Sequence, residues 1–323
     1  MNNKISVVIP TMNRLESLQE TIESYVGGVV IPDQIIIVDQ TEDAKLRLKI
    51  GEMIKTFKIG EMIKTFTDKV KIEYKYQNSA SSTKARNVGL KMCKNDIIIF
   101  SDDDITVFKN TLRDIQHIMN NQKISLIAGI NTNYQISKSK IGYLFGKKSF
   151  FKRNIGHVTK AMLGRFPEQR IDGQVKTEWA MGFFFVVRKS LIVKWSNYWD
   201  EKLVSYAYAE DLDFSYSYFK HSAEEGFFCI LDERVIVDHR VSREWRVPNK
   251  KSTRMYVINR TYLSYKHRMG VFSRIMIWWC DLGDFIFRLL HKSNAKDLFM
   301  AELVCSKHRK EIAAGILKPE WYE

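Results

Sequence analysis

The sequence predicts an α/β fold with a mostly parallel central sheet flanked by helices and a helical C-terminal extension. Two observations carry this prediction. Short apolar runs of strand length alternate with helical periodicity in the first half of the chain, and the chain turns helical and basic from Met255 onward. The 323 residues are 45% hydrophobic and 27% charged, which is ordinary globular composition.

Strands are predicted from apolar or alternating runs at 5–10, 35–39, 70–76, 97–100 and 124–130. Helices are predicted between them from apolar residues three or four apart, at about 15–25, 82–93 and 112–119. Ligands of parallel α/β sheets bind at the carboxyl ends of the strands. The polar residues that follow strands 5–10, 35–39 and 97–100 should therefore converge in space.

The nine residues KIGEMIKTF occur twice in tandem, at 49–57 and 58–66. Each copy has an apolar helical face, but a shift of nine residues at about 100° per residue rotates the second face by roughly 180°. One straight helix cannot bury both faces against one sheet. We predict a break near Lys58–Gly60, or one copy that is exposed or used in self-association. A neutral duplication in a tolerant surface element is the alternative.

Two later segments are rich in aromatic residues, and the first of them is also rich in basic residues. Residues 138–170 interleave them without a clear period, which predicts a mobile loop over a site. Segment 271–290 has a helical pattern with one narrow charged stripe and a broad apolar arc. The stripe consists of Arg274, Asp281, Asp284 and Arg288. This helix either packs on the main domain or lies on a membrane.

The net charge of +14 and the pI of about 9.4 indicate an anionic partner: nucleic acid, a phosphorylated substrate or an anionic membrane. The four cysteines form no CxxC pair, so no zinc site or disulfide framework is indicated. The N-terminus lacks a signal-peptide pattern, and no run reaches the ~18 apolar residues of a spanning helix. We expect a cytoplasmic protein, with peripheral attachment to the inner face of the membrane through 255–323 left open.

Three aspartates, Asp102, Asp103 and Asp104, follow the strand predicted at 97–100. Crowded carboxylates repel one another and lose solvation. A divalent cation would offset this repulsion, and Mg²⁺ and Mn²⁺ prefer carboxylate oxygens. Taken alone, the triplet fits a solvated turn or a helix N-cap equally well.

Five motifs in order give the triplet a context: SVVIPTMNR, IIIVDQTED, SSTKARNVGL, IIIFSDDDI and AYAEDLDFSYSYFK. Over roughly the first 240 residues they resemble the family 2 glycosyltransferases. The resemblance implies a GT-A fold with a Rossmann-like sheet, a nucleotide-sugar donor and usually inversion at the anomeric carbon. It also implies a divalent metal ion, Mn²⁺ or Mg²⁺. A UDP-sugar is the first expectation for the donor, with dTDP- and GDP-sugars open.

The resemblance also divides the chain. It implies a catalytic domain at 1–250, with a nucleotide-sugar half of about 1–105 and an acceptor half of about 106–250. Residues 251–323 would form a basic, amphipathic helical region.

Donor contacts are carried over to matching positions, which are Pro10, Thr11, Asn13, Arg14, Asp39, Arg86, Asp102 and Asp103. In the family, the residue at the position of Asp39 accepts a hydrogen bond from the base, which suits a pyrimidine. Arg86 would pair with phosphate or with the aspartate triplet.

The family's DxD pattern corresponds to Asp102-x-Asp104. It implies that Asp104 binds the metal ion and that Asp102 faces the ribose or a metal-bound water. Asp103 fills the variable position, so the alignment of the DxD pattern on the three aspartates can shift by one residue. Some family members add a late histidine as a further metal ligand, which would be His239; a structural histidine is the alternative.

Glu210 and Asp211 resemble the family's ED motif, which makes Asp211 the general base and Glu210 the residue that orients it or the acceptor. An acidic helix start is the alternative. The resemblance places Trp179 and Gly182 on the acceptor side, although Trp179 also suits a core position.

The sequence thus predicts a glycosyltransferase that extends a glycan or lipid-linked glycan in surface polysaccharide synthesis. A metal-dependent sugar nucleotidyltransferase would carry a glycine-rich phosphate loop near the N-terminus, and VVIPTMNR has no glycine. A basic nucleic-acid-binding protein would show a recognisable binding module, and none is evident. We therefore expect no nucleic-acid partner.

Overall fold

The structure, a computed structural model, describes residues 3–59, 70–132, 141–146, 155–167, 169–204, 208–242, 244 and 248–323. Its strands are β1 (Ile5–Thr11), β2 (Gln34–Asp39), β3 (Lys71–Tyr76), β4 (Ile97–Ser101), β5 (Ile105–Val107), β6 (Ile124–Asn131), β7 (Gln174–Lys176), β8 (Phe184–Arg188) and β9 (Phe228–His239). Its helices are α1 (Leu15–Val26), α2 (Ala44–Ile59), α3 (Ser82–Met92), α4 (Thr111–Met119), α5 (Ile141–Leu144), α6 (Lys189–Trp195), α7 (Glu210–Glu224), α8 (Asn249–Lys266), α9 (Val271–Leu290), α10 (Lys296–Lys307) and α11 (Arg309–Ala313). A 3₁₀ turn, Pro319–Tyr322, ends the chain.

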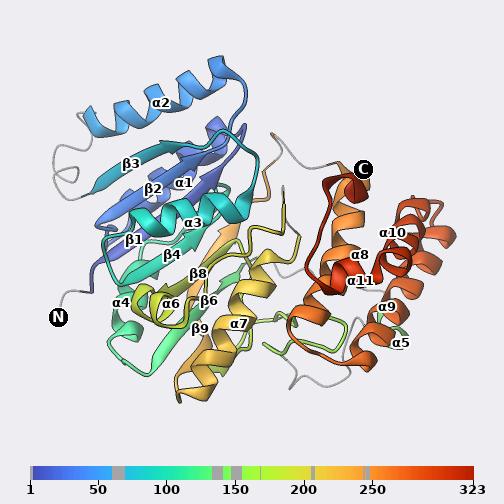
Figure 1. Ribbon diagram of the computed structural model, residues 1–323. Coiled ribbons are helices and arrows are strands. Elements are labelled where there is room, and N and C mark those ends of the chain that lie inside the picture. The colour runs from blue at the N-terminus through green and yellow to red at the C-terminus, as the bar shows by residue number, and fades with distance from the viewer. Residues whose placement is uncertain are drawn as a thin grey trace.

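One sheet organises the first 240 residues, and the C-terminal helices form a separate lobe beside it (Figure 1). The strand order is β3-β2-β1-β4-β8-β6-β9-β5, with β7 paired to β9. The β3-β2-β1-β4 half is parallel, as predicted, while β8 runs antiparallel to both β4 and β6. The chain order reverses between β1 and β4, and ligands of such sheets bind at this switch point.

The sheet is covered on both faces, so its central strands are buried along their whole length. Successive side chains of β1 enter different layers: Ile9 packs with α1 and α4, and Val8 packs with α3. Helix α3 approaches β1 closely at Gly89, where an added Cβ would lie 2.3 Å from a Val8 methyl. This close contact holds α3, which also carries Arg86, against β1.

The first copy of the tandem repeat lies in α2. Ile50 and Ile54 are buried, and Met53 and Phe57 pack against the same core. The second copy, 58–66, falls almost entirely outside the described residues, so its break or exposure stays a prediction.

The third core cluster joins the C-terminal helices to the sheet domain. Met255, Ile258 and Ile277 from these helices pack with Trp179 and Leu212. The domain boundary near 250 stays a prediction. Among the described helices, none combines the length and apolar character needed to cross a bilayer.

The segment 138–170, predicted as a mobile loop, is described only in parts. In 155–167, Val158, Ala161 and Met162 are buried in the third cluster, and Val158 pairs with Gly164 in an isolated β-bridge. This part therefore packs beneath the C-terminal helices, because its apolar residues are buried there. Residues 138–140, 147–154 and 168 lie outside the described residues.

Candidate active site

The carboxyl ends of β1, β2 and β4 converge, as the strand pattern predicts. Thr11 Oγ1 donates to Asp103 Oδ2 at 2.6 Å, which joins β1 to the aspartate triplet. The backbone N–H of Asn13 donates to Thr41 Oγ1 at 2.9 Å, and the N–H of Thr41 donates to Asp39 Oδ1 at 2.8 Å. Pro10 lies beside Val38 in the β1–β2 ladder. The loop after β1 is thus tied to both neighbouring strand ends.

Asp39 is fully buried at the end of β2. Its Oδ2 accepts a hydrogen bond from the Tyr74 hydroxyl at 2.8 Å, in addition to the bond from Thr41 to Oδ1. Burial, and then the hydrogen bond to Asp39 and the charge of Asp39, raise the pKa of Tyr74, so the phenol keeps its proton and remains a donor. No motif in the sequence indicates Tyr74, although the alternation at 70–76 predicts a strand there, and this strand, β3, pairs with β2 beside Asp39.

Asp103 is turned into the protein. Its Oδ1 lies 2.7 Å from Arg14 Nη1, its Oδ2 accepts from Thr11, and the residue is only 4% exposed. Burial raises the pKa of Asp103 to about 7, against the opposing effect of Arg14. Arg14 Nη1 also lies 3.2 Å from Asp104 Oδ2. Arg14 thus contacts two members of the triplet, and the predicted donor contacts of Arg14 and Asp103 stay predictions.

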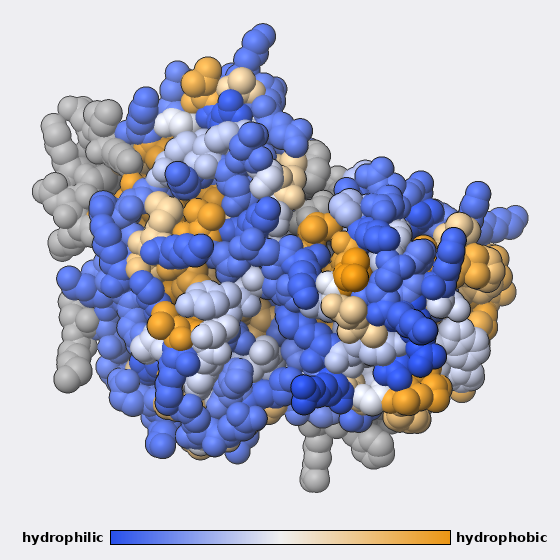
Figure 2. Space-filling model, in the orientation of Figure 1, coloured by the Kyte–Doolittle hydropathy of each residue, from blue (hydrophilic) through white to orange (hydrophobic). Residues whose placement is uncertain are grey.

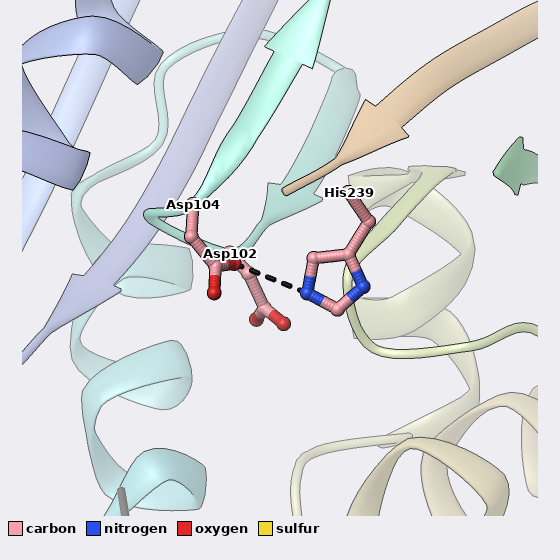
Figure 3. A group of neighbouring side chains, drawn as sticks. All are labelled: Asp102, Asp104 and His239. Atoms are coloured by element: carbon pink, nitrogen blue, oxygen red, sulfur yellow. Dashed lines mark ion pairs between the residues drawn. The ribbon is translucent and has the colours of Figure 1, made fainter. Parts of the chain in front are cut away.

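Asp102, Asp104 and His239 gather at the switch point, with one ligand atom of each within 4.8 Å of the others (Figure 3). His239, at the end of β9, places Nε2 3.2 Å from Asp104 Oδ1. The backbone N–H of Ser242 donates to Asp104 Oδ2 at 2.8 Å. Asp103 does not belong to this group, so the geometry favours the Asp102-x-Asp104 register.

The group fits a divalent cation in its donor chemistry. Two carboxylates and one imidazole suit Mn²⁺, and carboxylates alone suit Mg²⁺. Asp104 Oδ1 is buried and makes no hydrogen bond of good geometry within the described protein. Burial acts to raise the pKa of Asp104, but the close contact with His239 Nε2 and the charge of that imidazole outweigh it and lower that pKa. Asp104 is therefore held as a carboxylate, the form that binds metal ions.

Arg86 links the two halves of the site. Its Nη2 lies 3.1 Å from Asp102 Oδ1, its Nη1 lies 2.7 Å from Glu210 Oε1, and its guanidinium stacks 4.6 Å from the centre of the Trp199 ring. Burial acts to lower the pKa of Arg86, but the Glu210 and Asp102 charges outweigh it, so the guanidinium stays charged. The motif SSTKARNVGL indicated Arg86, whereas the stacking of Arg86 on Trp199 was not evident from the sequence.

Glu210 and Asp211 open α7, where the helix dipole favours acidic side chains. Asp211 Oδ2 accepts from the N–H of Gly182 at 2.8 Å, and Oδ1 accepts from the N–H of Leu212 at 2.7 Å. Burial raises the pKa of Asp211, against these two donors. Burial also raises the pKa of Glu210 to about 8, with Arg86 opposing the rise.

Gly182 and Trp179, both predicted on the acceptor side, have different surroundings. Gly182 lies directly against the base candidate, since an added Cβ would be 3.2 Å from Asp211 Cβ. Trp179 is only 6% exposed, stands against Gly164, and donates from Nε1 to the Arg165 carbonyl at 3.2 Å. These contacts agree with the core alternative for Trp179.

An open α/β sheet whose switch point carries paired aspartates, a histidine and a carboxylate at a helix start defines a GT-A-type fold. The chain belongs to the glycosyl transferase family 2, whose sequence profile matches residues 6–192. The fold class and the resemblance predicted from the sequence are thereby confirmed.

Three similar proteins illustrate the relationship. Over 129 residues the chain is 30% identical to the poly(ribitol-phosphate) beta-N-acetylglucosaminyltransferase TarP of Staphylococcus aureus (strain N315). This match covers 39% of the chain and 36% of that relative. The mannosyltransferase PcManGT from Pyrobaculum calidifontis, solved with GDP-Man and Mn²⁺, is 11% identical at a TM-score of 0.53, covering 97% of this chain and 84% of that one. GalNAc-T7, solved with UDP, GalNAc and Mn²⁺, is 17% identical at a TM-score of 0.56. This match covers 95% of this chain and 57% of that one. The two structures support the fold alone.

Proposed function

We propose that this chain is a metal-dependent, inverting glycosyltransferase that moves a sugar from a nucleotide-sugar donor to a glycan or lipid-linked glycan. The observation that carries the proposal is the bridge made by Arg86 between Asp102, on the donor side of the switch point, and Glu210, beside the base candidate. The buried guanidinium of Arg86 thus holds the donor-side Asp102 and the base-side Glu210 at a fixed separation, and an inverting displacement needs groups on both sides.

Asp211 is the proposed general base. It takes the proton of the acceptor hydroxyl while that oxygen bonds to the anomeric carbon, and the bond from this carbon to the diphosphate breaks, leaving its electron pair on the nucleotide. The two backbone donors from Gly182 and Leu212 hold the Asp211 carboxylate in one orientation. A raised pKa makes this carboxylate a stronger base than an exposed aspartate.

The donor is held, in this proposal, by the strand ends. Asp39, fixed by Tyr74 and Thr41, accepts from the base, and the loop from Pro10 to Arg14 encloses the nucleoside. Asp102, Asp104 and His239 would hold Mn²⁺ or Mg²⁺, which supplies charge neutralisation for the departing diphosphate. A UDP-sugar is the first candidate because a carboxylate acceptor suits a pyrimidine, and GDP- and dTDP-sugars are the others to test.

The acceptor is proposed from charge and from similarity. A net charge of +14 suits an anionic polymer or a lipid-linked diphosphate. TarP, whose name specifies a poly(ribitol-phosphate) acceptor, supports a cell-surface polymer for this chain as well. Synthesis of such a polymer from nucleotide sugars would place the protein in the cytoplasm beside the inner face of the membrane.

The decisive experiment screens UDP-, GDP- and dTDP-sugars for thermal stabilisation and hydrolysis, with Mn²⁺, Mg²⁺ or EDTA. We expect one nucleotide class to stabilise the protein only with metal. Asp211→Asn should retain this stabilisation and lose transfer by about 10²-fold or more. Full activity of Asp211→Asn would remove it as the base, and donor binding unaffected by EDTA would remove the metal site.

A further inference from the structure

Helix α9 packs on the protein with its small and polar side. Ser273, Cys280 and Gly283 are turned inward; Ser273 Oγ donates to the Lys160 carbonyl at 2.6 Å, and an added Cβ on Gly283 would lie 2.3 Å from the Phe145 ring. Cys280 Sγ lies 2.9 Å from the Phe145 carbonyl oxygen. Tight and polar contacts of this kind fix the rotation of the helix about its axis.

A buried ion pair fixes this rotation further. Asp281 of α9 pairs with Arg260 of α8, and both residues are fully buried. Arg288, in the last turn of α9, donates to Thr253 Oγ1 at 3.1 Å. The charged stripe predicted from the sequence therefore faces the protein, and the broad apolar arc faces outward.

The outward arc of α9 is exposed and apolar. Six side chains on it are each between 52% and 68% exposed: Val271, Phe272, Ile275, Trp278, Leu289 and Leu290. At about 100° per residue they span one continuous side of the helix. Helix α10 extends this surface with Phe299, whose ring lies 6.3 Å from that of Phe285, and with Leu303. Figure 2 shows apolar surface at the edge of the molecule where Figure 1 places α9 and α10.

The rim of this α9–α10 apolar face is cationic. Arg268 precedes α9, and Lys292 and Lys296 follow it, all exposed. The carboxylates of the two helices are buried or half-buried; they are Asp281, Asp284, Asp297 and Glu302. No exposed carboxylate of α9 or α10 therefore offsets these cations.

We propose that the α9–α10 apolar face docks on an anionic lipid bilayer, with α9 lying in the plane of the interface. An arc of Trp, Phe and Leu with lysines and arginine at its rim is the pattern of interfacial helices, and anionic headgroups attract such a rim. A second copy fits less well, because face-to-face association would bring the cationic rims together without a carboxylate to pair them. The inference is independent of the donor and acceptor proposed above.

Flotation of the full chain with lipid vesicles tests the proposal. We expect binding to phosphatidylcholine vesicles that contain phosphatidylglycerol, weaker binding to phosphatidylcholine alone, and a decrease at high salt. The double variant Ile275→Glu/Trp278→Glu should bind at least about tenfold less because two apolar groups no longer enter the interface. Val193→Glu, at a 54% exposed apolar position on α6, is the matched control and should bind like the wild type.

A second variant, Lys292→Ala/Lys296→Ala, separates charge from apolar burial. It should weaken binding to anionic vesicles and leave binding to neutral vesicles unchanged. Thermal unfolding of each variant should match the wild type because the altered side chains are exposed. The proposal is overturned if the wild type does not float with anionic vesicles, or if Ile275→Glu/Trp278→Glu binds as well as the wild type. A concentration-dependent dimer that this variant abolishes, without vesicle binding, would overturn it in favour of a second copy.

Discussion

Substitution of Arg86 by glutamine removes the charge that joins the two halves of the site. The Arg86 side chain is 4% exposed, and its partners Glu210 and Asp102 are 12% and 32% exposed. Glutamine cannot replace either ion pair. Glu210 is then left buried close to Asp211 without a counter-charge, so the pKa of Glu210, already raised to about 8, rises further.

The size of the effect follows from burial. Removing one partner of a buried pair costs about 3–5 kcal/mol, and the pair with Asp102 contributes less because that side chain is about one-third exposed. We expect Arg86→Gln to lower the free energy of unfolding by about 3 kcal/mol. We also expect transfer per folded molecule to fall by about 10²-fold, because both the donor-side aspartate and the base-side glutamate lose their fixed positions.

Arg188 provides the matched control. It is also buried, but it donates to the backbone carbonyls of Ile124 and Met119. Arg188 pairs with Ile97 in the β4–β8 ladder. Ile97 is five residues before Asp102, so Arg188 lies roughly 16 Å from Asp102 along the direction of β4. Arg188→Gln should cost stability without loss of transfer per folded molecule. Urea unfolding measures the stability of each variant, and an assay normalised to folded protein measures its transfer activity. The reasoning is refuted if Arg86→Gln keeps transfer within about twofold, or if Arg188→Gln loses as much.

Two further substitutions test single contacts. Gly182→Ala places a methyl 3.2 Å from Asp211 Cβ and 3.3 Å from Arg86 Nη2, so we expect about tenfold slower transfer with little loss of stability; Gly51→Ala, with nothing within 4 Å, should leave transfer unchanged. Glu302 has its pKa raised from 4.5 to about 8 by burial and the nearby Asp281, so the folded state holds this proton more tightly than the unfolded chain. Stability from this group is therefore present below pH 4.5 and is lost as the pH rises toward 8. Glu302→Gln should raise the unfolding temperature at pH 8 and flatten its pH dependence, and an unchanged slope would contradict this.

Much of the frame was predictable from local pattern. The runs at 5–10, 35–39 and 97–100 became β1, β2 and β4 because β-branched residues buried on both faces suit parallel strands. The short strands β5 and β7 and the antiparallel β8 were not predicted, since pairing direction depends on distant partners. Their places in the sheet became visible only in the folded chain.

The candidate site residues were likewise predicted from motifs, but the contacts between them were not. Because Asp102, Asp103 and Asp104 are adjacent, the sequence does not distinguish their roles. The turn after β4 distinguishes them: Asp103 contacts Thr11 and Arg14. Asp104 instead faces His239. Tyr74 was not predicted because its role depends on its hydrogen bond to Asp39 in the neighbouring strand.

The sequence by itself determined the order of strands and helices, the aspartates at a strand end and the amphipathic character of α9. Periodicity of a helix shows that its two sides differ, but it does not show which side meets the protein. The tertiary structure decided that question, because Arg260 on α8 supplies the buried partner that Asp281 needs. The charged side of α9 therefore turns inward, and its apolar side is left facing outward.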